Sequence, residues 1–169
     1  NTQPKVADSV QSLPADVTWL FGRDGSLTAQ LADGRWWTGC SAPRAAAAAV
    51  LDKAQVQGAV ACLIDPLHAA HVKRVLARLT RQQAVIVVKP ENAWLAVAMG
   101  ADDFSAEMVE GRLWWACGDD WIDALAGLLC ENPGLPIPQQ FIRIPAADEE
   151  RTSSLMAARM PMMPPAITN

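Results

Sequence analysis

The apolar positions between residues 59 and 144 follow two alternating patterns. Three short runs are almost continuously apolar, as in strands buried on both faces of a sheet, at residues 59–64, 84–88 and 113–117. Between and after them the apolar residues recur at helical spacing, at 67–79, 92–99, 104–109 and 119–130. Residues 139–144 read as a further extended segment. Strands separated by helices predict right-handed crossovers and a parallel sheet, which is an α/β fold with a three-layer, Rossmann-like core.

The pattern before residue 59 is different. Short apolar runs at 17–21, 26–31 and 35–38 are separated by Asp24-Gly25 and Asp33-Gly34, and Asp-Gly steps are strong hairpin signals. We therefore expect a three-stranded antiparallel β-meander ahead of the parallel core. A helix is expected over 41–57, capped by Ser41 and with Pro43 in its first turn. The chain then divides into a polar lead-in (1–16), the α/β domain with its meander (17–145) and an irregular or helical arm (146–169).

Composition narrows the class of protein. The chain has 169 residues, of which 51% are hydrophobic, enough for a core of its own. A net charge of -4 gives no general attraction to nucleic acid or to anionic lipid. The four cysteines form no C-x-x-C pair, and no apolar run is long enough to cross a membrane. These features predict a reduced, cytoplasmic protein that binds neither nucleic acid nor a membrane.

The tips of the predicted parallel strands are where a fold of this kind would bind a cofactor. The turn after the first strand runs from Asp65 to His71 without a glycine, and Pro66 removes a backbone N–H that would otherwise face a phosphate. The next strand ends in Lys89, which cannot accept hydrogen bonds from ribose hydroxyls as an acidic residue would. We expect a degenerate site and no cofactor. Its candidate residues are Asp65, His68, Lys89, Glu91 and Asp119.

Two pairs of side chains can each be interpreted either as part of a functional site or as ordinary structural residues. Asp119 and Asp120 follow the third strand and would bind a metal or act as a base, or else cap the next helix. His68 and His71 are three residues apart, which suits half of a zinc site or two partly exposed residues at a helix start. No third ligand is evident, so we expect no metal site and no catalytic residue.

Two further groups also remain open. A basic cluster is expected to be a solvated helix face or a patch for phosphate or an acidic partner; it comprises Lys73, Arg74, Arg78 and Arg81. The pairs Trp36-Trp37 and Trp114-Trp115 would put one ring of each pair away from the core if they lie in strands. Those rings would fill a core, stack on a sugar or form a domain interface.

Several short motifs occur in a fixed order along the chain. They are Val85-Ile86-Val87-Val88-Lys89-Pro90, Asp103-Phe104-Ser105, Gly111-Arg112-Leu113, Gly118-Asp119-Asp120-Trp121, Asn132-Pro133-Gly134-Leu135-Pro136 and Gln140-Phe141-Ile142-Arg143-Ile144-Pro145. Over residues 17–145 this order resembles the N-terminal methyltransferase-like domain of CgeB-type and motility-accessory bacterial glycosyltransferases. That family tends to have a glycine-rich turn where this chain has 65–71, and Glu where it has Lys89.

The resemblance implies an accessory, non-catalytic module that packs against a downstream catalytic domain, since the glycosyl-transfer residues of such proteins belong to that later domain. The chain would be part of a glycosyltransferase only within a longer protein. Two alternatives stay open. One is a divergent methyltransferase-like domain that binds S-adenosylmethionine or a nucleotide, and the other is a stand-alone protein-interaction module.

Overall fold

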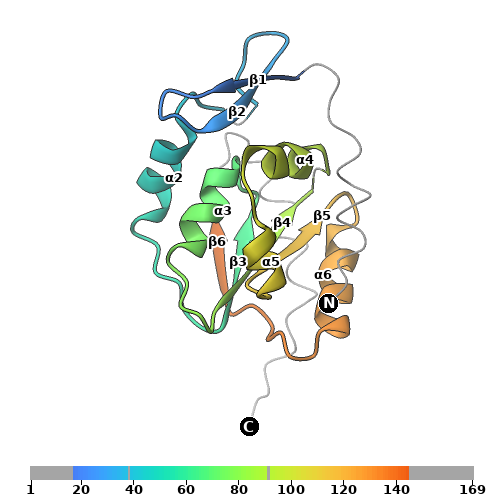
Figure 1. The fold of residues 1–169 in the computed structure, drawn as a ribbon. Helices are drawn as coiled ribbons and strands as arrows, with labels where there is room; N and C mark the ends of the chain where they lie inside the picture. The colour runs from blue at the N-terminus through green and yellow to red at the C-terminus, as the bar shows by residue number, and fades with distance from the viewer. Residues whose placement is uncertain (1–16, 38, 91, 145–169) are drawn as a thin grey trace.

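The computed structural model describes residues 17–37, 39–90 and 92–144. They form a mixed α/β structure with a four-stranded parallel sheet and a separate two-stranded antiparallel sheet (Figure 1). The expected lead-in at 1–16 and the expected arm at 146–169 lie outside these residues.

Three strands of the parallel sheet form from the continuously apolar segments, and the fourth forms from the extended segment near residue 140. The four strands are β3 (Val60–Ile64), β4 (Ala84–Lys89), β5 (Leu113–Cys117) and β6 (Gln140–Arg143). They lie in the order β5-β4-β3-β6, and every neighbouring pair is parallel. The predicted bounds of the first three strands are therefore correct to within one residue. Of these four strands, β3 comes first in the chain and lies inside the sheet, whereas β6 comes last and forms an edge.

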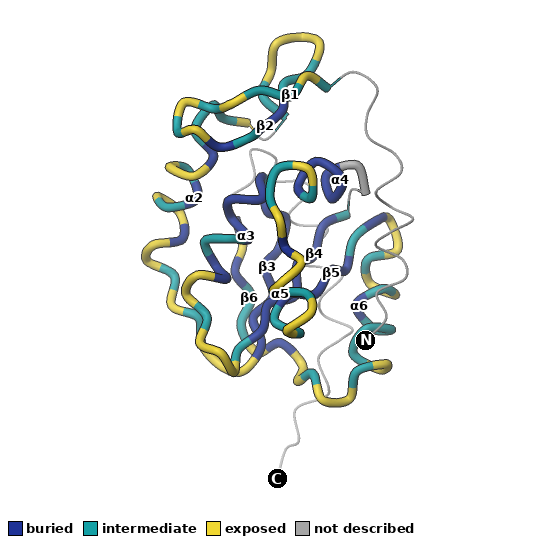
Figure 2. Tube along the Cα trace, viewed as in Figure 1, coloured by how far each residue is buried: buried dark blue, intermediate teal, exposed yellow. Residues whose placement is uncertain are grey.

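Helices cover both faces of this sheet. Three of them, α3 (Ala69–Leu76), α4 (Asn92–Ala101) and α5 (Ser105–Val109), lie on one face (Figure 1). On the other face α6 (Trp121–Glu131) packs on β5 and β4. Alternate strand residues accordingly enter two separate hydrophobic clusters. Figure 2 shows this buried interior between exposed outer surfaces.

Helices on both faces of the sheet correct the expectation that one ring of the pair Trp114-Trp115 points away from the core. Trp114 and Trp115 are adjacent on β5 and point to opposite faces, yet both are at least nine-tenths buried. Trp115 packs beside Trp94 and makes an edge-to-face contact with Phe104, whose ring centroid is 5.5 Å away. Neither ring of this pair is available to stack on a sugar.

The antiparallel sheet consists of β1 (Val17–Phe21) and β2 (Leu27–Leu31). We call residues 17–37 the hairpin unit. The predicted third strand is reduced to an isolated bridge between Gln30 and Trp36, with a hydrogen bond of 2.9 Å from the Trp37 N–H to the Ala29 carbonyl. Glycines in the left-handed region allow both turns, as the two Asp-Gly steps predict.

The helix after the hairpin unit is shorter than predicted and is capped differently. It is α2 (Pro43–Leu51), and its N-cap residue, Ala42, makes no side-chain hydrogen bond. The cap comes instead from the β1–β2 turn, where the Asp24 carboxylate accepts from the Arg44 N–H at 2.6 Å and the Ala45 N–H at 3.2 Å. The expectation of a Ser41 cap was wrong, because the helix begins one residue later, with Ala42 as its N-cap residue. The Ser41 carbonyl instead accepts from the Arg23 N–H at 2.6 Å.

The same carboxylate also organises its own turn. Ser26 donates to Asp24 from both its backbone N–H and its hydroxyl. Burial alone would raise the pKa of Asp24, but the bonds from Ser26 and from the N–H groups of Ala45 and Arg44 lower that pKa to about 2. The carboxylate thus stays charged above this pH and joins the hairpin unit to α2.

We predict that Asp24→Ala destabilises the protein by about 1 kcal/mol, because two N–H groups of α2 lose their acceptor. The loss should be present at neutral pH and should disappear as the pH falls from 3.8 towards 2, where the parent carboxylate is itself protonated. Urea unfolding at several pH values measures it. Asp33→Ala is the control, since Asp33 bonds only to Arg35 within its own exposed turn. Equal losses for the two variants would contradict the capping role.

Candidate functional site

The tips of β3 and β4 bring together two of the predicted site residues. Ile64 and Val88 are paired in the parallel register, so Asp65, just after β3, comes to lie beside Lys89, the last residue of β4. The Lys89 ammonium donates to the Asp65 carboxylate, and each side chain is only 4% exposed. The two charges therefore form a buried ion pair at the place where a cofactor would approach the sheet.

The backbone of Asp65 is held in place by its position at the end of β3 and by a hydrogen bond to β4. Asp65 has φ 50°, in the left-handed region, and its N–H donates to the Val88 carbonyl at 2.9 Å. Aspartate tolerates this conformation better than most residues with a side chain. Pro66 follows and is buried as well. The turn after β3 therefore folds back against β4.

An aromatic ring lies over the ion pair. The Lys89 ammonium is 5.7 Å from the centroid of the Trp94 ring, close enough for a cation–π attraction. The Trp94 indole N–H donates to the Leu67 carbonyl at 3.1 Å, which joins α4 to the turn after β3. The Gly118 N–H donates to the Lys89 carbonyl at 2.9 Å, so the end of β5 is also joined to Lys89.

The two histidines are buried, with exposed fractions of 4% for His68 and 2% for His71. This corrects the expectation that they are partly exposed. His68 is the N-cap of α3, where its Nδ1 accepts from the Ala70 N–H at 2.9 Å. The His71 Nδ1 accepts from the His68 N–H at 3.2 Å, which completes a capping box made of histidines.

Burial controls the protonation of both rings. It lowers the pKa of His68 below its usual 6.5, although a hydrogen bond to the Leu27 carbonyl and the nearby Asp24 carboxylate act in the opposite direction. For His71, burial is again the largest cause and lowers the pKa to about 4, with His68 adding to the effect. Both rings are therefore neutral at neutral pH.

The remaining candidates do not join this group. Glu91 lies outside the described residues. Asp119 is exposed after β5, and the expected carboxylate cap on α6 is not made, because the N-cap residue, Asp120, forms no side-chain hydrogen bond. The structure thus unites Asp65 with Lys89, keeps His68 on the same turn, and leaves Asp119 at the surface.

The basic cluster is largely paired with acidic residues. Lys73 contacts Glu107 at 3.1 Å and Asp102 at 3.8 Å, while Arg74 and Arg78 both pair with Asp52. These contacts join α3 to the segment around α5 and to the end of α2. They leave less positive charge for a phosphate than the sequence suggests.

Three other features limit the chemistry of the described part of the chain. Its His, Cys, Asp and Glu side chains nowhere gather in a group of three or more that could hold a metal ion. The four cysteines, all of them described, form no disulfide. None of the described helices is both long and apolar enough to cross a bilayer.

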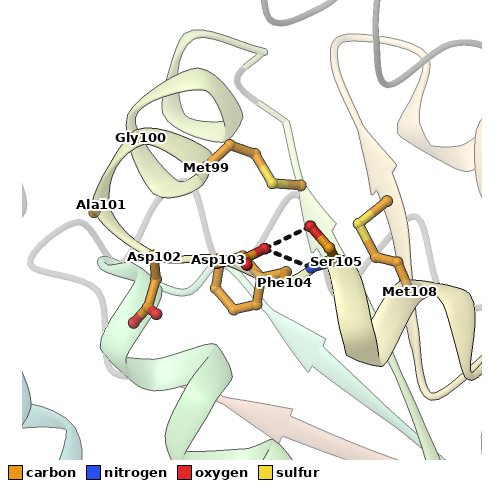
Figure 3. A pocket seen from close by; sticks show the side chains of 8 residues that line it. All are labelled: Met99, Gly100, Ala101, Asp102, Asp103, Phe104, Ser105 and Met108. Atoms are coloured by element: carbon orange, nitrogen blue, oxygen red, sulfur yellow. Dashed lines mark hydrogen bonds between the residues drawn. The ribbon is translucent and has the colours of Figure 1, made fainter.

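Sequence reasoning missed an open depression of about 600 Å³ between α4 and α5. Met99 and Met108 flank it, and Phe104 and Ser105 lie between them (Figure 3). The Asp103 carboxylate accepts from the Ser105 N–H at 2.9 Å and from its hydroxyl at 2.5 Å. Nothing in the spacing of these residues foretells the depression, because it arises where α4 ends and α5 begins.

Comparison with models of protein families, with curated proteins and with solved structures gave no match for this chain.

We predict that breaking the ion pair on one side costs more than removing both charges. Lys89→Met leaves a buried carboxylate, and Asp65→Asn leaves a buried ammonium, so each should destabilise the fold by about 3 kcal/mol or more. The double variant should recover much of this loss. Urea unfolding of the four proteins tests the prediction, and Arg35→Met, at an exposed pair, should cost much less than either single variant. Additive losses would show that the pair is not coupled.

Proposed function

We propose that this chain is an accessory, non-catalytic Rossmann-like module of a bacterial glycosyltransferase-type protein. Its role is to scaffold or position a catalytic domain further along the natural protein, in the cytoplasm. The catalytic residues, and with them the glycosyltransferase activity, belong to that later domain.

The strand order supports the Rossmann-like part of the proposal. From β3 the chain builds outward through β4 to β5, then returns past them to place β6 on the other side of β3. The helices of the first half lie on one face, and α6 lies on the other. This reversal beside the first strand is the arrangement of the first four strands in doubly wound dinucleotide-binding folds.

The buried pair between Asp65 and Lys89 is the observation that carries the non-catalytic part. In a cofactor-binding fold of this type, the first strand leads into a glycine-rich turn whose N–H groups face the ligand. Here the first strand leads into a carboxylate that is bonded to the next strand, followed by a buried proline. The groups that would meet a cofactor satisfy one another instead.

The glycosyltransferase context rests on the resemblance of the ordered motifs. In the structure, several of those motifs lie in strands of the parallel sheet or directly beside them. Gly111-Arg112-Leu113 leads into β5, Gly118-Asp119-Asp120-Trp121 joins β5 to α6, and the last motif contains β6. Residues at these positions contribute to the sheet and its crossovers, which is compatible with a packing role for the motifs.

Calorimetric titration with S-adenosylmethionine and with a uridine diphosphate sugar tests the proposal. We expect no saturable heat at up to millimolar ligand and no shift in melting temperature, because a bound ligand would stabilise the fold in proportion to its occupancy. Micromolar binding of either ligand, abolished by the double variant Asp65→Asn/Lys89→Met, would replace the proposal with a divergent methyltransferase-like or nucleotide-binding enzyme.

A second measurement addresses the scaffold role. In the natural protein that contains this chain, Asp65→Asn/Lys89→Met should leave glycosyl transfer intact, because the pair is structural. Replacement of the whole module by a flexible linker should reduce the yield of folded, active enzyme. Full activity after that replacement would contradict a positioning role. Light scattering of the chain alone would show self-association if it is instead a stand-alone interaction module.

A further inference from the structure

The short helix α5 is poorly covered by the rest of the described structure. None of its residues is buried, and Val109 at its end is 82% exposed. Met108 on the same helix is half-buried and packs at the rim of the core cluster. A helix that lies over a sheet normally buries an apolar stripe. α5 therefore presents apolar surface for which the described part of the chain provides little cover.

The depression between α4 and α5 continues this apolar surface. It is open to solvent, and Figure 3 shows the side chains of Met99 and Met108 on either side of Ser105. Phe104, which also lines it, is almost fully buried and packs on Trp115. Methionine side chains are flexible and adapt to irregular partners. A hollow with two of them at its edges suits an apolar side chain from another polypeptide.

Carboxylates outnumber cations around the depression. Two of its lining residues, the helix α5 and the residue after α5 contribute four of them: Asp102, Asp103, Glu107 and Glu110. Two cations lie among these groups. Lys73 contacts Glu107 and Asp102, as described above, and Arg112 contacts Glu110 at 3.6 Å. Four negative and two positive charges leave an excess of two negative charges beside the apolar hollow.

Asp103 is the carboxylate of this group that forms no salt bridge within the described part of the chain. It is exposed, and the Ser105 hydroxyl and N–H both donate to it. These bonds lower the pKa of Asp103, so its carboxylate is charged at neutral pH. An exposed, charged carboxylate at the wall of an apolar hollow favours a partner that carries a positive charge next to an apolar side chain.

We propose that this depression is the surface on which the later catalytic domain docks, and that the docking segment presents an apolar side chain flanked by Lys or Arg. The inference rests on the proposed function, because it takes that domain to follow this module. The apolar side chain lies between Met99 and Met108, and the cation reaches Asp103. The same contact covers Val109.

Two other exposed features fit this role less well. The acidic residues Asp119, Asp120 and Asp123 lie at the N-terminal end of α6, where the helix dipole already favours carboxylates. Phe21 at the end of β1 is largely exposed and lies two residues from the exposed Arg23. A second copy of this chain therefore presents similar chemistry to the depression, and the test has to separate the two occupants.

Thiol labelling at position 109 tests the docking. In a background with Cys40→Ser and Cys130→Ser, Val109→Cys is treated with a maleimide in this chain alone and in the natural protein that contains the later domain. Cys62 is buried, and burial raises the pKa of Cys117 to about 12, so both of these thiols react slowly. We expect labelling at position 109, read by mass spectrometry, to be at least about tenfold slower in the natural protein.

A second position provides the matched control. Ile137, in the segment between α6 and β6, is 62% exposed, and Ile137→Cys should be labelled at a similar rate in both proteins. Equal rates for Val109→Cys in the two proteins would overturn the proposal. A slowing that is the same at both positions would also overturn it, because it would show general crowding instead of docking at the depression.

Charge reversal tests the chemistry of the docking segment. Asp102→Lys/Glu110→Lys should abolish the protection of position 109, whereas Asp120→Lys/Asp123→Lys makes the same change in net charge away from the depression and should preserve it. Asp103→Asn keeps an acceptor for Ser105 without the charge and should weaken the protection severalfold. Melting temperatures of the variant chains identify any that fail to fold. Full protection in folded variants of the depression would show that the docking segment is not basic.

Dilution separates the two occupants. The labelling rate of Val109→Cys in the chain alone should be the same at about 1 µM and about 100 µM protein. A rate that falls with concentration, and that Phe21→Ser restores, would place a second copy in the depression and overturn the proposal.

Failure of this inference is distinguishable from failure of the proposed function. An unprotected position 109, in an enzyme that still requires the module, would remove this docking surface and leave the scaffold role intact. Protection of position 109, in an enzyme that stays fully active with a flexible linker in place of the module, would contradict the scaffold role and leave the docking surface intact.

Discussion

The arrangement of this protein depends on the buried ion pair between Asp65 and Lys89. Two charges in the interior are tolerated only when each satisfies the other, and this holds the tips of β3 and β4 at one separation. Trp94 over the ammonium and the Gly118 N–H on the Lys89 carbonyl extend the same junction to α4 and β5. These contacts lie at the carboxyl end of the sheet, which is where open α/β sheets in general bind their ligands.

A different kind of contact holds the hairpin unit. Its connections to the rest of the chain include a carboxylate cap on α2, a histidine bond to β2 and the close approach of Trp19 to Gly100. Polar contacts of this sort stabilise less than the burial of a core residue, and they respond to pH. The molecule thus combines a core that is held by apolar packing with an attached hairpin unit that is held by polar contacts together with the buried Thr28 and Ala29 of β2.

Much of the parallel fold could be predicted, because strands buried on both faces are continuous apolar runs that the sequence displays directly. The cap that Asp24 provides for α2 could not be predicted, because Asp24 is distant in sequence from Arg44 and Ala45 and reaches them only in the folded chain. The ion pair had a readable signal. Asp65 and Lys89 follow consecutive predicted strands, whose carboxyl ends meet at one edge of a parallel sheet, so an acid and a base at these two positions favour an ion pair. The identity of any partner lies beyond the sequence, because it depends on surfaces and not on periodicity.

The strand order has a consequence for how the chain folds. Ala61, near the start of β3, pairs in register with Gln140 of β6, so one edge of β3 stays unpaired until the last strand arrives. Long-range parallel pairing of this kind is slow, and in the meantime it leaves apolar side chains and unpaired backbone groups exposed. The β1–β2 pairing and the Asp24 cap on α2 join residues within about 20 positions of one another, so both can form while the ribosome is still adding residues. Newly made chains should therefore be most prone to aggregation, and most dependent on chaperones, in the interval before β6 emerges.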